Sequence, residues 1–141
     1  GNSHGWIVGD KGVILATTDP GKTWHVQNSG TTRALFAVDF LDDNEGFAVG
    51  GGGTILRTLD GGHRWEPVAS GHTYTLKRVN FADEKNGWIV GFNGAILRSQ
   101  DGGRTWEKVA SPSAARLFGL YITKKYGFAV GEKGLVLEYS P

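Results

Sequence analysis

The sequence contains no cysteine and no methionine, and only four of its 141 residues are proline. Without cysteine, a disulfide scaffold and a thiolate metal site are both excluded. No apolar run approaches the roughly 20 residues that span a bilayer, and no charged start followed by an apolar stretch predicts a signal peptide. The formal net charge of +1 is too small to draw the whole chain onto nucleic acid. We therefore expect neither a membrane span nor a nucleic-acid partner.

Glycine, by contrast, is abundant, and its positions reveal an internal repeat. The chain has 23 glycines, well above the usual share of roughly 7%. The segment GWIVG at 5–9 returns as GFAVG at 46–50, as GWIVG at 87–91 and as GFAVG at 127–131. The period is therefore 41 residues, with a last interval of 40. A period of this length is typical of solenoids, propellers and other repeat arrays.

Each repeat has the pattern of several short strands. Runs such as 88–90 and 95–97 are apolar on successive residues, which is typical of sheets buried on both faces. No segment shows a sustained helical period, and glycine interrupts every run within about ten residues. Four antiparallel strands in about 41 residues is the size of one propeller blade. The sequence therefore predicts an all-β fold of β-propeller blades, forming a partial or an oligomer-completed propeller.

The repeat boundaries predict one repeat domain over residues 1–141. We expect a partial blade over 5–30, full blades over 31–71 and 72–112, and a second partial blade over 113–141. An open array of this kind exposes an apolar face at each end, and such faces are usually covered. The expected partner is a second copy, giving a homodimer with about eight blade-like units. Closure of one chain into four blades is the main alternative.

Three of the four repeats continue into the pattern Ser/Thr-x-Asp-x-Gly-x-Thr-Trp, which is the Asp-box or bacterial neuraminidase repeat. The Asp can accept hydrogen bonds from its own turn, the Gly tolerates a left-handed conformation, and the Trp packs over the hairpin. A catalytic carboxylate is needed once and not once per repeat, and calcium takes about six or more oxygens from one loop. A structural role is therefore favoured over catalysis or calcium binding. The Asp-box residues are Asp19, Gly21 and Trp24, then Asp60, Gly62 and Trp65, and finally Asp101, Gly103 and Trp106.

The repeat as a whole resembles the photosynthesis system II assembly factor family. The resemblance rests on GWIVG, on the run NGAILR at 93–98 and on the box DGGRTW at 101–106, and it extends from Gly5 to Leu137. Members of that family form seven-bladed propellers that act as non-enzymatic assembly or scaffolding factors in thylakoids. The resemblance implies a protein-binding module without a cofactor, whose partner is not fixed by the sequence. It also implies a location in the thylakoid lumen, in the periplasm or outside the cell.

Asp-boxes also occur in sialidases and in glucan-degrading propellers, so a glycan-binding or sialidase-like hydrolase is the alternative function. Sialidases hold the substrate carboxylate with three arginines from different blades, but no second motif in this sequence fixes such a set. The four histidines are scattered, which argues against a zinc site. A fragment or engineered array without activity of its own is the third interpretation. The candidate binding residues are Arg33, Arg57, Arg78, Arg98, Arg116 and Tyr74.

Overall fold

The computed structural model describes residues 3–140, so residues 1–2 and 141 of the predicted repeat domain lie outside the described residues. The described residues form 14 strands in four antiparallel sheets, which confirms the all-β prediction. Their helical elements are four 3₁₀ turns of three residues each. None of these turns has the length needed to cross a membrane.

The sheets follow one another in chain order. Sheet 1 contains β1 (Gly5–Val8), β2 (Ile14–Thr17) and β3 (His25–Gln27). Sheet 2 contains β4 (Leu35–Phe40), β5 (Gly46–Gly50), β6 (Thr54–Thr58) and β7 (Glu66–Val68). Sheet 3 contains β8 (Leu76–Phe81), β9 (Gly87–Gly91), β10 (Ile96–Ser99) and β11 (Glu107–Lys108). Sheet 4 contains β12 (Leu117–Ile122), β13 (Gly127–Gly131) and β14 (Val136–Tyr139).

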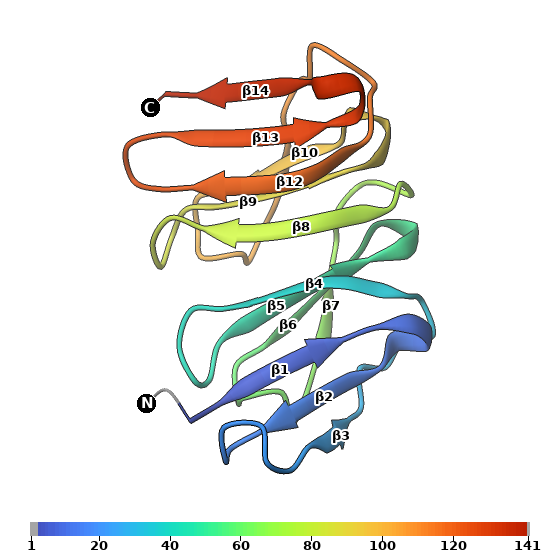
Figure 1. Cartoon of the computed structure of the whole chain (residues 1–141), viewed down its shortest axis with the longest axis vertical. Coiled ribbons are helices and arrows are strands. Elements are labelled where there is room, and N and C mark those ends of the chain that lie inside the picture. Colours follow the sequence, from blue (N-terminus) through green and yellow to red (C-terminus); the bar gives the residue numbers. More distant parts are fainter. Residues whose placement is uncertain (1–2, 141) are drawn as a thin grey trace.

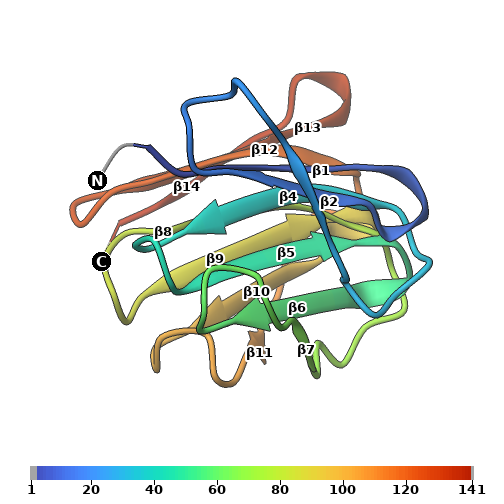
Figure 2. The same ribbon diagram turned by 90° about the horizontal axis from the view of Figure 1, so that it is seen from below.

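The four sheets form an open array. Figure 1 shows them in chain order along the long axis, with sheet 1 and sheet 4 at opposite ends. The inner strands β4, β8 and β12 come first in their sheets and lie next to one another. Figure 2, seen from below, shows sheets 2 and 3 one behind the other, with their strands overlapping in the view. The four-bladed ring considered as an alternative is therefore not formed by the described chain.

Aromatic side chains join each sheet to the next. Between sheets 2 and 3, the rings of Phe47 and Phe81 stack with their centroids 4.9 Å apart, and the Trp106 ring meets both edge-on. This trio belongs to a core that includes Val49 and Ile89, both fully buried. The equivalent trio between sheets 1 and 2 consists of Trp6, Phe40 and Trp65. The Asp-box tryptophans of sheets 2 and 3 thus contribute to the packing between neighbouring sheets.

Candidate functional site

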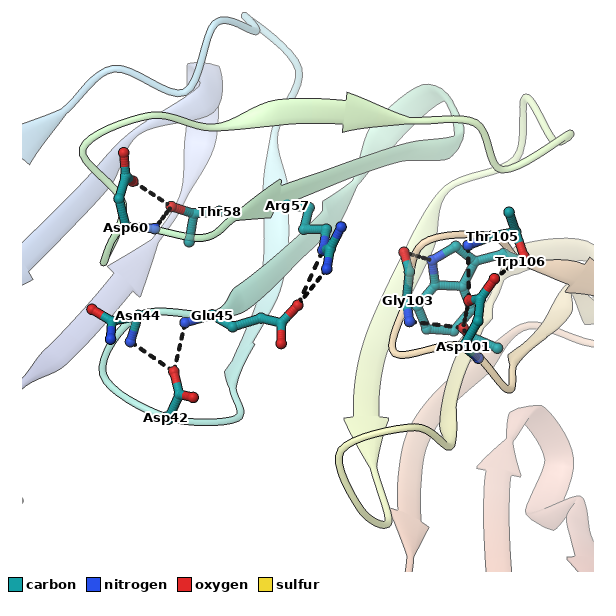
Figure 3. Close-up of polar contacts among 11 residues, drawn as sticks. Asp42, Asn44, Glu45, Arg57, Thr58, Asp60, Asp101, Gly103, Thr105 and Trp106 are labelled. Carbon is teal, nitrogen blue, oxygen red and sulfur yellow. Dashed lines mark hydrogen bonds and ion pairs between the residues drawn. The ribbon is translucent and has the colours of Figure 1, made fainter.

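The Asp-box of sheet 3 is a network of hydrogen bonds around Asp101. Its carboxylate accepts the backbone N–H of Thr105 at 3.0 Å and the Thr105 hydroxyl at 2.5 Å (Figure 3). The buried Ser99 hydroxyl donates to the same carboxylate at 2.8 Å and accepts the N–H of Gly103 at 2.8 Å. Gly103 has a φ of +83°, and a Cβ there would lie 2.2 Å from the ring of Phe47. The turn therefore needs glycine both for its backbone and for the close approach of the neighbouring sheet.

The Asp-boxes of sheets 1 and 2 differ from each other in one hydroxyl group. In the box of sheet 1, Asp19 accepts the backbone N–H of Thr23 at 2.8 Å and its hydroxyl at 2.5 Å. In the box of sheet 2, Arg64 replaces that threonine, and Asp60 accepts its backbone N–H alone at 2.9 Å. The turn is kept in all three boxes, while the second box has one charged hydrogen bond fewer.

These hydrogen bonds lower the pKa values of the Asp-box carboxyl groups. The pKa of Asp101 falls to about 2, chiefly because the hydroxyl of Thr105 donates to its carboxylate. The pKa of Asp19 also falls to about 2, chiefly through the hydroxyl of Thr23. The pKa of Asp60 is lowered mainly by the backbone N–H of Arg64. Carboxylates that are ionised so readily are poor general acids near neutral pH.

We expect Asp101→Ala to lower the free energy of unfolding by about 1 kcal/mol at pH 7, a modest value because the hydrogen bonds are exposed to water. A lowered folded-state pKa contributes stability that is complete above the unfolded pKa of about 4 and is lost as the pH falls towards 2. In thermal melts, the difference in unfolding free energy between Asp101→Ala and the parent should therefore shrink as the pH falls from 4 to 2. Asp60→Ala is the matched control. It should lower the unfolding free energy less, because Arg64 supplies no hydroxyl donor where the third box has Thr105. If the difference in unfolding free energy is as large at pH 2 as at pH 7, the ionised Asp101 carboxylate is not the source of the stability.

The candidate binding residues Arg33, Arg57, Arg78 and Tyr74 have separate local contacts. Arg57 is half-buried and forms an ion pair with Glu45 at 2.6 Å (Figure 3). Arg78 is exposed and donates to the carbonyl of Lys77 at 2.7 Å. Arg33 is exposed beside Gly52, and the last candidate, Tyr74, stacks at a tilt on His72 with ring centroids 5.4 Å apart. Each of these side chains thus has a different neighbour.

Three equivalent β-bulges occur at the same position of the inner strands β4, β8 and β12. In β4, β8 and β12, the pairing register with the next strand shifts by one residue near the start of the strand. The extra residues are Phe36, Lys77 and Phe118. A bulge turns the side chain of its extra residue away from the regular pleat and often lies next to a functional site. Phe36 and Phe118 are accordingly 39% and 40% exposed, although both are large and apolar.

Two further residues connect the bulged positions into one surface, which we call the bulge patch (Phe36, Lys77, Phe92, Arg116 and Phe118). The Lys77 ammonium lies 3.9 Å from the ring centroid of Phe36 and 5.6 Å from that of Phe92. The Arg116 guanidinium lies 4.9 Å from the Phe92 centroid. Phe92 and Phe118 meet edge-on at 6.4 Å. The patch thus combines two cations with three aromatic rings, a surface suited to carboxylates and apolar side chains.

Comparison with known proteins identifies the family of the chain. The sequence profile described as photosynthesis system II assembly factor YCF48 matches residues 1–70, 22–110 and 68–140. The chain belongs to this family. A comparison with curated proteins found no match.

Two solved YCF48 structures share the fold. The structure titled "YCF48 bound to D1 peptide" is 23% identical, with a TM-score of 0.79 over 100% of this chain and 47% of that one. YCF48 from Cyanidioschyzon merolae is 22% identical, with a TM-score of 0.79 over 96% of this chain and 50% of that one. An ancestral GH74 enzyme is 15% identical, with a TM-score of 0.66 over 99% of this chain and 24% of its own. The present chain spans about half the length of the two YCF48 structures.

In this YCF48-family chain, sequence reasoning singled out Arg116 but missed the other four residues of the bulge patch. A signal was present in the repeat itself. The position after the first Leu of the inner strand is Phe36, then Lys77, then Phe118, while the flanking Leu recurs in all three strands. A position that varies within an otherwise regular repeat is not required for core packing, so its side chain can contribute to binding.

Other polar groups of the YCF48-family chain have local roles. Asp39 is half-buried, and burial raises the pKa of its carboxyl group. It accepts the backbone N–H of Phe81 at 3.1 Å and so ties inner strand β4 to inner strand β8. Among residues 3–140, no three His, Cys, Asp or Glu side chains come together as a metal site.

Proposed function

We propose that this chain is a non-enzymatic, polypeptide-binding part of a propeller and that its partner binds at the bulge patch. The observation that supports this most is that three equivalent β-bulges present Phe36, Lys77 and Phe118 on neighbouring strands. One YCF48 structure is described as bound to a D1 peptide. We therefore also propose that the partner is a polypeptide segment met during the assembly of photosystem II.

The chemistry of the patch defines the kind of segment that fits. Lys77 and Arg116 each lie against an aromatic ring, so their charges are held in place and lose little freedom when an anion binds. Phe36 and Phe118 offer exposed apolar surface on either side. A segment that carries a carboxylate between apolar residues satisfies both parts of this surface.

The test is a titration of the chain with the D1 peptide by isothermal titration calorimetry. Lys77→Glu is expected to weaken binding by about tenfold or more, because a like charge faces the carboxylate of the segment. Lys125→Glu is the charge-matched control, since Lys125 is exposed on the turn between β12 and β13 and lies outside the patch. Equal affinities for the parent and Lys77→Glu would exclude the bulge patch. No binding by the parent would reject the peptide-binding proposal itself.

A glycan-active propeller is the second candidate function. The Asp-box pattern also occurs in sialidases, and an ancestral GH74 enzyme shares the fold. We expect no hydrolysis of fluorogenic sialosides and no binding on a glycan array. Clear turnover, or sub-millimolar sugar binding, would replace the peptide-binding proposal with this candidate.

We further propose that two copies associate through their end sheets. On the outer face of sheet 4, Val130 is 43% exposed, whereas the repeat-equivalent Val49 in sheet 2 is 0% exposed. On the outer face of sheet 1, Ile7 is 48% exposed, whereas the equivalent Ile89 in sheet 3 is 0% exposed. Both end faces therefore have the apolar composition of surfaces that pack between sheets elsewhere in the array. In a head-to-tail dimer, the outer face of sheet 4 in one copy covers the outer face of sheet 1 in the other copy.

Light scattering at micromolar concentration is expected to give twice the 15.2 kDa mass of the chain. Val130→Lys should restore the single-chain mass without loss of the cooperative melt, because it places a charge on the outer face only. Thr73→Lys, in the exposed loop before β8, is the control and should leave the mass unchanged. A parent mass near 15.2 kDa would reject the dimer.

A further inference from the structure

Two grooves lie at repeat-equivalent places beside the 3₁₀ turns η2 (Gly51–Gly53) and η3 (Phe92–Gly94). The first groove is lined by residues 29–31, 53–56, 65 and 67–73 and has a volume of about 490 Å³. The second groove is lined by residues 72, 93–96 and 108–114 and has a volume of about 400 Å³. The first groove belongs to sheet 2, and sheet 3 after it has all four strands. A groove at this place is therefore a feature of the repeat that persists where the next outer strand is present.

Lys108 gives the second groove a charge that the first groove lacks. The first groove has Pro67 at the equivalent position, and no aspartate or glutamate among the described residues lines either groove. The Lys108 side chain lies against the linker before β8, since a Cβ added at Gly71 would be 3.7 Å from the ammonium nitrogen. Within residues 3–140 this ammonium has no ion pair and no hydrogen bond. Its charge is therefore available to a ligand.

His72 stands beside Lys108 and also lacks a polar partner. Its Nε2 atom is buried and forms no hydrogen bond in the described part of the chain. The ring rests against Tyr74, with the ring centroids 5.4 Å apart. Burial, and then the charge of Lys108, lower the pKa of the imidazole, so the ring is neutral near pH 7. A buried nitrogen without a partner is unfavourable, and an oxygen atom brought into the groove can satisfy it after a rotation of the ring.

The second groove is continuous with the bulge patch. Its residue Asn93 directly follows Phe92 of the patch in the η3 turn. The linker that lines the groove leads into Arg116 of the patch. The Gly94 N–H donates to the carbonyl of Ala115 at 2.9 Å, which holds the turn and the linker together. A polypeptide segment that covers the bulge patch therefore reaches the groove across a single turn.

An acidic side chain is the group that fits this groove. One oxygen of a carboxylate can accept a hydrogen bond from the Lys108 ammonium, and the other can accept one from the His72 imidazole or from the amide of Asn93. A basic side chain would meet the like charge of Lys108 instead. The bulge patch also carries two cations, so the patch and the groove together favour a segment with acidic residues at two places.

We propose that the second groove is a subsite for an acidic residue of a bound polypeptide segment, with Lys108 as its charged anchor. This inference rests on the proposed function, because the segment that enters the groove is the one held at the bulge patch. The patch takes a carboxylate between apolar residues, and the groove takes a second acidic side chain a few residues away along the segment.

The probe is a set of peptides with acetylated N-termini and amidated C-termini. Each contains the core Leu-Asp-Leu for the bulge patch, joined by Gly-Ser or Gly-Ser-Gly-Ser to a glutamate before or after the core. An extended chain rises about 3.3 Å per residue, so these linkers cover the distance from one turn to the adjoining linker. The matched peptides carry glutamine in place of that glutamate. In calorimetric titration, at least one glutamate peptide should bind about threefold more tightly than its glutamine partner, the size of one exposed ion pair.

Lys108→Gln should abolish this preference for glutamate, because it removes the charge of the groove. Lys85→Gln is the matched control, since Lys85 is exposed on the turn between β8 and β9 and lines neither groove. His72→Thr should reduce the preference in part, and it is compatible with the linker turn because Thr31 occupies the equivalent position. The NMR signals of the His72 imidazole should shift when the glutamate peptide binds and should stay in place with the glutamine peptide.

Three results would overturn the groove alone. The first is equal affinity within every pair of glutamate and glutamine peptides. The second is a preference that Lys108→Gln leaves unchanged, because the glutamate would then lie elsewhere. The third is a shift of the His72 signals by sodium phosphate as large as that by the glutamate peptide at the same concentration, which would indicate a site for small anions.

Failure of the bulge patch would look different. Lys77→Glu should weaken both members of each peptide pair alike, because both carry the same core. If no peptide binds the parent chain, the proposed function and this inference are both wrong.

Discussion

Truncation of Phe47 to alanine is expected to lower the free energy of unfolding by about 3–5 kcal/mol, the usual range for a fully buried phenylalanine. Phe47 is the largest of the fully buried side chains and stands at the centre of the aromatic trio between sheets 2 and 3. Gly103 of the third Asp-box packs directly on its ring. Loss of the ring therefore removes contacts from both sheets at once, and the cavity cannot be filled by a flexible neighbour.

Phe128→Ala is the matched control, because Phe128 occupies the same place in GFAVG but is only half-buried on sheet 4. In the separate chain, where part of the ring contacts water, its truncation should cost about 1 kcal/mol. Chemical denaturation of the two variants at equal concentration measures the difference. Equal losses of unfolding free energy would show that the environment of Phe128 in sheet 4 is packed as tightly as that of Phe47.

Gly53→Ala is the second substitution with a large expected effect, about 3 kcal/mol or more. Gly53 ends the 3₁₀ turn η2 (Gly51–Gly53) with a φ of +75°. A left-handed conformation costs an alanine roughly 1–2 kcal/mol. In addition, the new Cβ would lie 1.9 Å from the carbonyl oxygen of His72, so the loop before β8 must move.

Gly134→Ala separates these two causes. Gly134 ends the turn η4 (Glu132–Gly134) with a φ of +74°, and no atom lies within 4 Å of an added Cβ. The control should therefore show the conformational cost alone, roughly 1–2 kcal/mol. Thermal and urea unfolding of both variants gives the comparison. If Gly53→Ala lowers the unfolding free energy no more than Gly134→Ala does, the loop before β8 moves aside at no measurable cost.

The regular part of the fold could be predicted because the sequence repeats it. The recurrence of GWIVG and GFAVG predicts the strands β1, β5, β9 and β13, and the glycine-interrupted apolar runs predict an all-β chain. Each of these features is local and repeated several times. A different fold would therefore rarely produce the same pattern in every repeat by chance.

The candidate binding surfaces could not be predicted in the same way. The bulge patch depends on a one-residue register shift, and the variable residue after the first Leu of each inner strand does not by itself reveal that shift. Phe92 lies in a turn, and its approach to Arg116 depends on how sheets 3 and 4 are placed together. Among residues 3–140, the Nε of Arg98 has no hydrogen-bond partner, and Asn86 stands where the preceding repeat has Glu45, the partner of Arg57. The sequence difference between Glu45 and Asn86 could not be interpreted before the ion pair of Arg57 was known.

In the proposed function, the three bulges separate the residues that bind a partner from the residues that stabilise the fold. The bulged side chains Phe36, Lys77 and Phe118 occupy positions outside the regular strand pairing. The leucines before them, such as Leu76, are fully buried and hold the sheets together. Substitution at the bulges therefore changes what the surface selects while the scaffold keeps its fold. In the proposed function, sheets 2, 3 and 4 each contribute one exchangeable side chain to binding, so a point mutation at a bulge can change the partner without compensating changes in the core.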